Sequence, residues 1–77
     1  MSRVKVMAFW DAEADVWVAS SDDVPGLNVE SGDWPSLLAD LDDLVPEMLT
    51  ANGSEFDDNL ELEIEAKYVG PVHRLAA

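Results

Sequence analysis

The chain contains 77 residues with 17 acidic and four basic side chains, a formal net charge of −13, and no cysteine. A chain of this length forms one domain with a thin core, and the lack of cysteine excludes disulfides and thiolate zinc sites. No apolar run approaches the roughly 20 residues that span a bilayer, and the N-terminal segment does not have the pattern of a signal peptide. We therefore expect a single cytoplasmic domain over residues 1–77, ordered from about residue 3 to residue 69 and loose over residues 70–77.

The first two predicted strands form a hairpin. Residues 3–10, RVKVMAFW, place Val and Ala at every second position, which is typical of a strand with one buried face. A polar turn over residues 11–15 leads to a second strand over residues 16–21, VWVASS. Because side chains alternate between the two faces of a strand, the buried face of this second strand depends on the hairpin register, which the sequence leaves open.

A Pro-Gly turn leads into a short third strand. Pro25 fixes φ and Gly26 permits a positive φ, so residues 22–27 predict a tight, defined turn. Leu27, Val29 and Ser31 then alternate along the predicted strand.

An amphipathic helix follows, and we expect Asp33 at its N-cap, where a carboxylate can accept the free amides of the first turn. Pro46 removes the amide that would bond to the Asp42 carbonyl, but the apolar pattern continues in phase beyond it, so a kink is expected rather than an end. Asn52-Gly53 is typical of a helix C-terminus. The apolar stripe consists of Leu37, Leu38, Leu41, Leu44, Val45, Met48 and Leu49.

Residues 60–69, LELEIEAKYV, alternate most regularly and predict a half-buried fourth strand. The order β-β-β-α-β indicates an α+β fold, with a four-stranded mixed sheet and one helix on one face. The fourth strand is expected to return parallel to the first. Arg3 and Lys5 would then lie beside the acidic row formed by Glu61, Glu63 and Glu65.

The charges are unevenly distributed along the chain. All 17 acidic residues lie between Lys5 and Lys67, and no lysine or arginine lies between those two. Such a surface repels phosphate backbones and anionic lipids, which disfavours nucleic-acid and membrane partners. A basic protein would be attracted and steered toward it. The alternative interpretation is that the acidic residues only keep a small protein soluble.

Large apolar side chains are expected on both faces of the sheet. Met7 and Phe9 lie opposite the buried face of the first strand, and the second strand carries apolar groups on both sides. An exposed apolar patch on a small domain usually marks an interface. We therefore predict self-association into a homo-oligomer, with Met7, Phe9 and Val18 in the interface.

Three segments together resemble one known family. The strand Val16-Trp17-Val18-Ala19 leads into Asp22-Asp23-Val24-Pro25-Gly26-Leu27, Gly32-Asp33 begins the helix, and Asn52-Gly53 ends it. Over about residues 3–69 the chain resembles the HicB-like antitoxin domain, and most of all the short HicB-like proteins that form a domain of unknown function. It departs from the family at Leu27, where many members have cysteine, and at the helix start, Asp33-Trp34-Pro35-Ser36.

The resemblance implies a partial ribonuclease-H-like fold, self-association, and binding of a small, basic HicA-type toxin that cleaves messenger RNA. Because no DNA-binding module follows the fourth strand, we expect no DNA binding. The residues expected to contact a partner are those of the turn and of the acidic helix face: Asp22, Asp23, Pro25, Gly26, Leu27, Asp40, Asp42, Asp43 and Glu47.

Two catalytic or metal-binding alternatives start from the same acidic residues. Residues 11–15, DAEAD, place acids at alternate positions, but a calcium loop needs a glycine at its sixth position, where this chain has Val16. A metal-dependent nuclease would use Asp11 with Glu47 or Asp40 around magnesium, but the helix acids are expected to face solvent. The single histidine, His73, lies in the tail, without a frame to orient it as a base. We expect a binding protein that has no cofactor and is not an enzyme.

Overall fold

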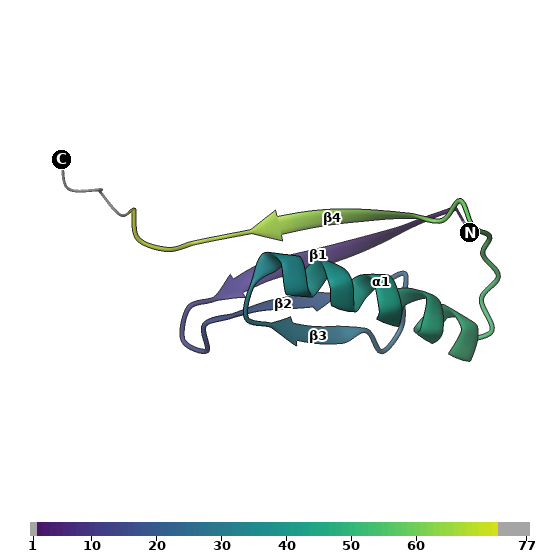
Figure 1. The fold of residues 1–77 in the computed structure, drawn as a ribbon, viewed down its shortest axis with the longest axis horizontal. Helices are drawn as coiled ribbons and strands as arrows, with labels where there is room; N and C mark the ends of the chain where they lie inside the picture. Colours follow the sequence, from purple (N-terminus) through teal and green to yellow (C-terminus); the bar gives the residue numbers. More distant parts are fainter. Residues whose placement is uncertain (1, 73–77) are drawn as a thin grey trace.

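The computed structural model describes residues 2–72, so His73 and residues 74–77 of the predicted tail lie outside the described residues. The elements are β1 (Arg3–Asp11), β2 (Val16–Ser20), β3 (Asn28–Ser31), α1 (Trp34–Ala51) and β4 (Glu61–Lys67) (Figure 1). The strands form one mixed sheet in the order β3-β2-β1-β4, in which β4 is parallel to β1 and the other pairs are antiparallel. The predicted α+β layout and the order β-β-β-α-β are confirmed.

The register of the β1–β2 hairpin settles which face of β2 is buried. Trp10 pairs with Trp17 and Phe9 pairs with Val18, so Trp17 shares a face with the buried residues of β1 and Val18 lies on the opposite face. The turn is closed by the Asp11 carboxylate, which accepts the backbone N–H groups of Glu13 and Ala14 at 3.1 and 3.3 Å.

The parallel pairing of β1 and β4 brings opposite charges together on the face of the sheet away from the helix. Arg3 lies 3.5 Å from Glu61 and 3.6 Å from Glu63, and the Lys5 ammonium lies 3.0 Å from Glu65. The predicted proximity of the first and fourth strands is therefore confirmed. Exposed ion pairs of this kind add little stability. Like charges at the same positions would disfavour this strand register.

Helix α1 begins and ends as its sequence predicts. The Asp33 carboxylate accepts the Ser36 backbone N–H at 2.8 Å, and Asn52 forms the C-cap. Pro46 lies inside the helix, which continues for another five residues to Ala51. The Thr50 hydroxyl donates to the Pro46 carbonyl at 2.9 Å, which adds a bond within this turn.

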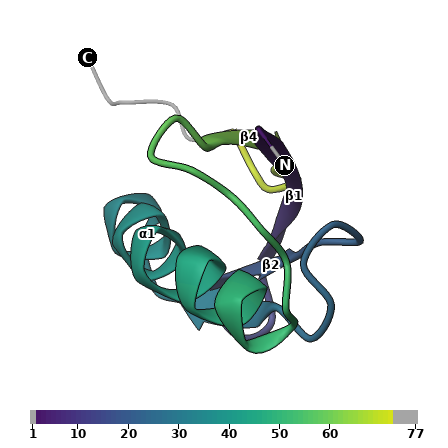
Figure 2. The same cartoon turned by 90° about the vertical axis from the view of Figure 1, so that its right-hand side faces the viewer.

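The core lies between α1 and one face of β1, β2 and β3. The backbone of α1 approaches β3 and β2, whereas no Cα atom of α1 lies within 8 Å of a Cα atom of β4. Figure 2 shows the helix set to one side of the sheet, away from β4. The buried apolar residues are Val4, Val6, Ala8, Ala19, Val24, Leu27, Val29, Leu37, Leu41, Val45 and Leu49. Within residues 2–72 no helix is both long and apolar enough to cross a membrane.

Candidate functional site

The outer surface of α1 is acidic along most of its length. Asp40, Asp42, Asp43 and Glu47 are all exposed, and the helix contains neither lysine nor arginine. We call these four residues the acidic helix surface. Their exposure follows from the helical period, because the buried residues Leu37, Leu41, Val45 and Leu49 recur every four positions and occupy the opposite side.

Two members of the acidic helix surface lie at its flanks. Asp40 accepts a hydrogen bond from the Ser31 hydroxyl at 2.6 Å, which ties the helix to β3. Asp42 lies on the other flank, at the rim of a hollow between α1 and β4. Asp43 and Glu47, one turn apart, lie between these flanks and point toward solvent.

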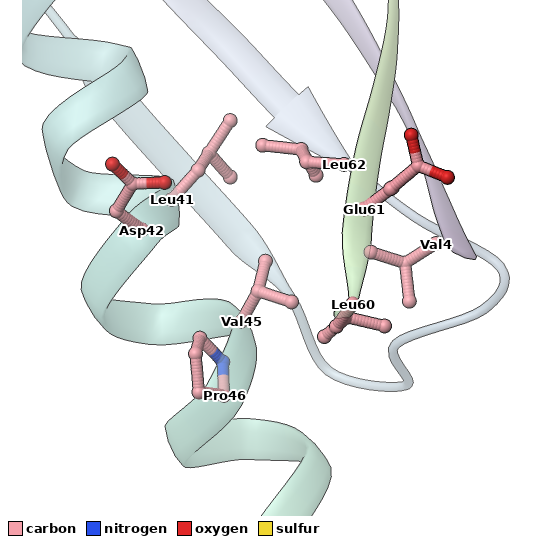
Figure 3. Close-up of a pocket in the computed structure, with 8 residues that line it drawn as sticks. All are labelled: Val4, Leu41, Asp42, Val45, Pro46, Leu60, Glu61 and Leu62. Carbon is pink, nitrogen blue, oxygen red and sulfur yellow. The ribbon is translucent and has the colours of Figure 1, made fainter. Parts of the chain in front are cut away.

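The hollow beside Asp42 has a volume of about 90 Å³ and is lined by apolar side chains together with Asp42 and Glu61. In Figure 3, Leu41 and Val45 project from α1, Leu62 points from β4 toward Leu41, and Val4 and Leu60 lie on the side of β1 and β4. Small-molecule sites in proteins usually enclose roughly 300–1,000 Å³. This hollow has space for a few water molecules and does not have the volume of a substrate pocket.

The turn over residues 22–27 is fastened to the rest of the domain. The Asp23 carboxylate accepts the Lys5 backbone N–H at 2.8 Å, and the Pro25 carbonyl accepts the Asn52 side-chain amide at 3.1 Å. Val24 and Leu27 are buried in the core. The Leu27 side chain therefore does not lie on the surface that the sequence predicted for a partner, whereas Asp22, Pro25 and Gly26 are exposed.

Arg3 and Lys5 form their ion pairs away from the acidic helix surface. The pKa of Lys5 is raised above its ordinary value of 10.5, first by its hydrogen bond to Glu65 and then by the charge of that carboxylate. At the helix start, the hydrogen bonds from Ser36 lower the pKa of Asp33 below its ordinary value of 3.8. No cation within residues 2–72 forms an ion pair with α1.

The predicted oligomer interface forms a patch on the sheet face opposite the helix. Met7 and Phe9 are 48% and 47% exposed, and the pairing of Phe9 with Val18 places these two side by side on that face. The position of the patch agrees with the sequence-based expectation, and its role in self-association stays a prediction.

An aromatic cluster at one end of the buried sheet face was not predicted as a unit. Trp17 is its centre, with ring centroids 5.6 Å from Trp10, 5.0 Å from Trp34 and 6.3 Å from Tyr68. The rings contact one another at tilted and edge-on angles, so they pack together and do not enclose a cage. The cluster depends on the hairpin register, which explains why the sequence pattern alone did not reveal it.

The acids of the proposed nuclease do not assemble. Asp11 belongs to the hairpin turn, and the helix acids face solvent. Across residues 2–72, no group of three or more histidine, cysteine, aspartate or glutamate residues is placed to hold a metal ion.

Residues 3–72 match a protein family described as a domain of unknown function, DUF1902. The chain belongs to this family. It is also similar to a solved structure, that of the hypothetical protein TTHA1013 from the extremely thermophilic bacterium Thermus thermophilus. The two share 44% sequence identity with a TM-score of 0.70, over 94% of this chain and 99% of that one. A comparison with curated proteins gave no match. The likeness to TTHA1013 therefore extends over nearly the whole of both chains.

Proposed function

We propose that this DUF1902 domain is a protein-binding module of HicB-like antitoxin type that neutralises a small, basic HicA-type toxin. The observation that carries the proposal is the acidic helix surface, in which four exposed carboxylates occur on a helix without a single cation. A basic surface is the chemical complement of this arrangement, and complementary charges raise the rate of productive encounter.

The division of charge between the two sides of the molecule supports this choice. Arg3 and Lys5 are engaged with β4 glutamates on the sheet face away from the helix. Neither of these two cations neutralises Asp43 or Glu47, which present their negative charge to solvent. A toxin that binds RNA needs a positive surface for the phosphate backbone, and the acidic helix surface would cover it in place of RNA.

The fold is compatible with the same assignment. The order β-β-β-α-β, with β4 parallel to β1, fits the partial ribonuclease-H-like arrangement expected of HicB-like domains. In this proposal the chain acts by steric and electrostatic blockade, without chemistry of its own, and the fastened turn over residues 22–27 serves to hold the C-terminal half of α1 in place.

The test is inhibition of messenger RNA cleavage by a purified HicA-type toxin from the same genome. The chain at equimolar concentration should suppress cleavage, and the variant Asp42→Lys with Asp43→Lys should lose at least tenfold in binding while retaining its circular dichroism spectrum. The matched control reverses two exposed acids outside α1, Glu13→Lys with Asp58→Lys, which changes the net charge equally.

The control variant should inhibit nearly as well as the unmodified chain, and binding should weaken as salt rises. Equal losses in both double variants would mean that only net charge matters. No suppression by the unmodified chain would reject the antitoxin assignment and favour the second candidate, a toxin-free homo-oligomer. The exposed Met7 and Phe9 are the observation that favours that candidate.

A further inference from the structure

We propose that β4 pairs with β4 of a second copy of this chain, antiparallel about a two-fold axis at Ile64, so that the two sheets join into one. The inference concerns a surface that the proposed function does not use. It rests on the backbone of β4, on its charges and on its uncovered apolar side.

The backbone of β4 is unpaired along one edge. In the sheet order β3-β2-β1-β4 this strand is terminal, and its partner is β1 alone. The Glu61 N–H donates to the Ser2 carbonyl at 2.9 Å, so the backbone groups of Glu61 face β1. Because these groups alternate in direction along a strand, those of Leu62, Ile64 and Ala66 face outward.

The register of the proposed pair follows from these outward groups. Ile64 is the middle residue of β4, Glu61–Lys67. An axis at Ile64 pairs it with its own counterpart and pairs Leu62 with Ala66 of the second copy, as hydrogen-bonded pairs of an antiparallel ladder. This register uses every outward backbone group of the strand and leaves no residue of β4 unpaired.

The two ends of β4 are complementary in charge in the same register. Arg3 is shared between Glu61 and Glu63, at 3.5 and 3.6 Å, and Lys67 forms no ion pair within residues 2–72. The two-fold axis places Lys67 opposite Glu61 of the second copy. The same register places Glu63 opposite Glu65 of the second copy, and this like-charge pair lies beside the cations that already contact those two glutamates, Arg3 and Lys5.

The apolar side of β4 is also left incomplete by a single copy. Leu62 and Ile64 are only half-buried and Ala66 is exposed, because α1 lies over β2 and β3. Pairing brings Ile64 against its counterpart and Leu62 against Ala66 of the second copy, so the apolar strip becomes continuous across the junction. At the opposite end of the sheet, β3 has only four residues, and a short strand is a poorer template for pairing.

The absence of cysteine allows a direct test with single cysteine variants. Residues in a hydrogen-bonded antiparallel pair have Cα atoms about 5.5 Å apart, within the range that a disulfide spans. Ile64→Cys should therefore cross-link to a covalent dimer under mild oxidation. Leu62→Cys should not, because its own counterpart lies about 13 Å along the strand. Phe9→Cys tests the alternative interface of Met7, Phe9 and Val18, which lies on the sheet face away from the helix.

A second pair of variants keeps the test independent of any damage at Ile64. Lys67→Glu should weaken dimerisation at least fivefold in sedimentation equilibrium, and the swap Glu61→Lys with Lys67→Glu should restore it. Cross-linking of Phe9→Cys but not of Ile64→Cys would overturn the proposal, as would a chain that remains monomeric at millimolar concentration.

Salt distinguishes this proposal from toxin binding. Two copies that each carry 13 negative charges repel, so dimerisation should strengthen as salt screens that repulsion, whereas binding of a basic toxin should weaken. Loss of one interaction can therefore be recognised without loss of the other.

Discussion

The Asp23 carboxylate accepts the backbone N–H of Lys5 at 2.8 Å, across 18 positions of sequence. The Ser21 hydroxyl donates to the Lys5 carbonyl, and the Asp23 N–H donates to the Ser21 hydroxyl at 3.1 Å. The β1–β2 ladder ends at the pair of Met7 with Ser20. Just beyond it, side chains of the turn provide the hydrogen-bond partners of the Lys5 N–H and carbonyl. The Pro-Gly turn is held to the sheet by this small network.

Asp23→Ala should lower the free energy of unfolding by about 1 kcal/mol, because the Lys5 N–H loses its acceptor. The thermal midpoint should fall by roughly 4–8 °C. Asp23→Asn keeps an oxygen acceptor and should lose less, and the neighbouring exposed Asp22→Ala should be nearly neutral. Equal losses for Asp22→Ala and Asp23→Ala would contradict the structural role of this bond.

Gly26 and Gly53 both have a positive φ, but only Gly26 is crowded by a neighbouring side chain, so alanine substitutions at the two positions distinguish backbone strain from steric crowding. Gly26 has φ of 86°, and a Cβ there would lie 3.1 Å from the Met48 methyl carbon, whereas Gly53 has φ of 74° with open space around it. Gly53→Ala should cost about 1–2 kcal/mol from conformation alone. Gly26→Ala should cost more in chemical denaturation, and Gly26→Ala combined with Met48→Ala should show a smaller added cost than the two changes summed. Gly32→Ala, with neither feature, is the control.

The N-cap of α1 makes the stability of the fold depend on pH in the acidic range. The pKa of Asp33 is lowered in the folded chain by the hydrogen bonds from Ser36, so the ionised form is favoured by folding. Its contribution is present above the ordinary value of 3.8 and is lost as pH falls through the lower folded pKa. Asp33→Ala should lower the melting temperature by a few degrees at pH 7, and the difference from the unmodified chain should shrink below about pH 4. Asp33→Ser should retain most of the cap at both pH values.

The Lys5–Glu65 pair gives the opposite dependence at high pH. The pKa of Lys5 is raised by Glu65, so its contribution is present below 10.5 and is lost as pH rises through the higher folded pKa. Glu65→Gln should move the Lys5 pKa back toward 10.5 when the side chain is titrated by nuclear magnetic resonance. An unchanged Lys5 titration in that variant would show that the 3.0 Å contact does not persist in solution.

Local patterns predicted most of the fold, including the capped helix and its passage through Pro46. The clustering of Arg3 and Lys5 with the glutamates of β4 also followed from the alternation in the two strands. Two features did not follow. The hairpin register, which sends Trp17 inward, depends on packing between distant rings, and the displacement of α1 away from β4 depends on the volume of the whole core.

The candidate site could likewise be predicted only where it depends on local sequence patterns. The exposure of Asp43 and Glu47 follows from the helical period, which the sequence displays. The burial of Leu27 and the hydrogen bond between Asp23 and Lys5 are long-range contacts that the sequence pattern does not display. Through these contacts the turn over residues 22–27, predicted as a partner-binding loop, is attached to the core and to β1.

Because β4 is attached to the sheet through β1 alone, assembly of the domain divides into two stages. Residues 3–51 can form their hairpin, third strand and helix through short loops, whereas β4 must join Arg3 to Glu61 across 58 positions of sequence. We expect the fourth strand to add last and to detach first. In a dilute monomer, the amides of Glu63 and Glu65 should then exchange with solvent faster than those of the β1–β2 hairpin.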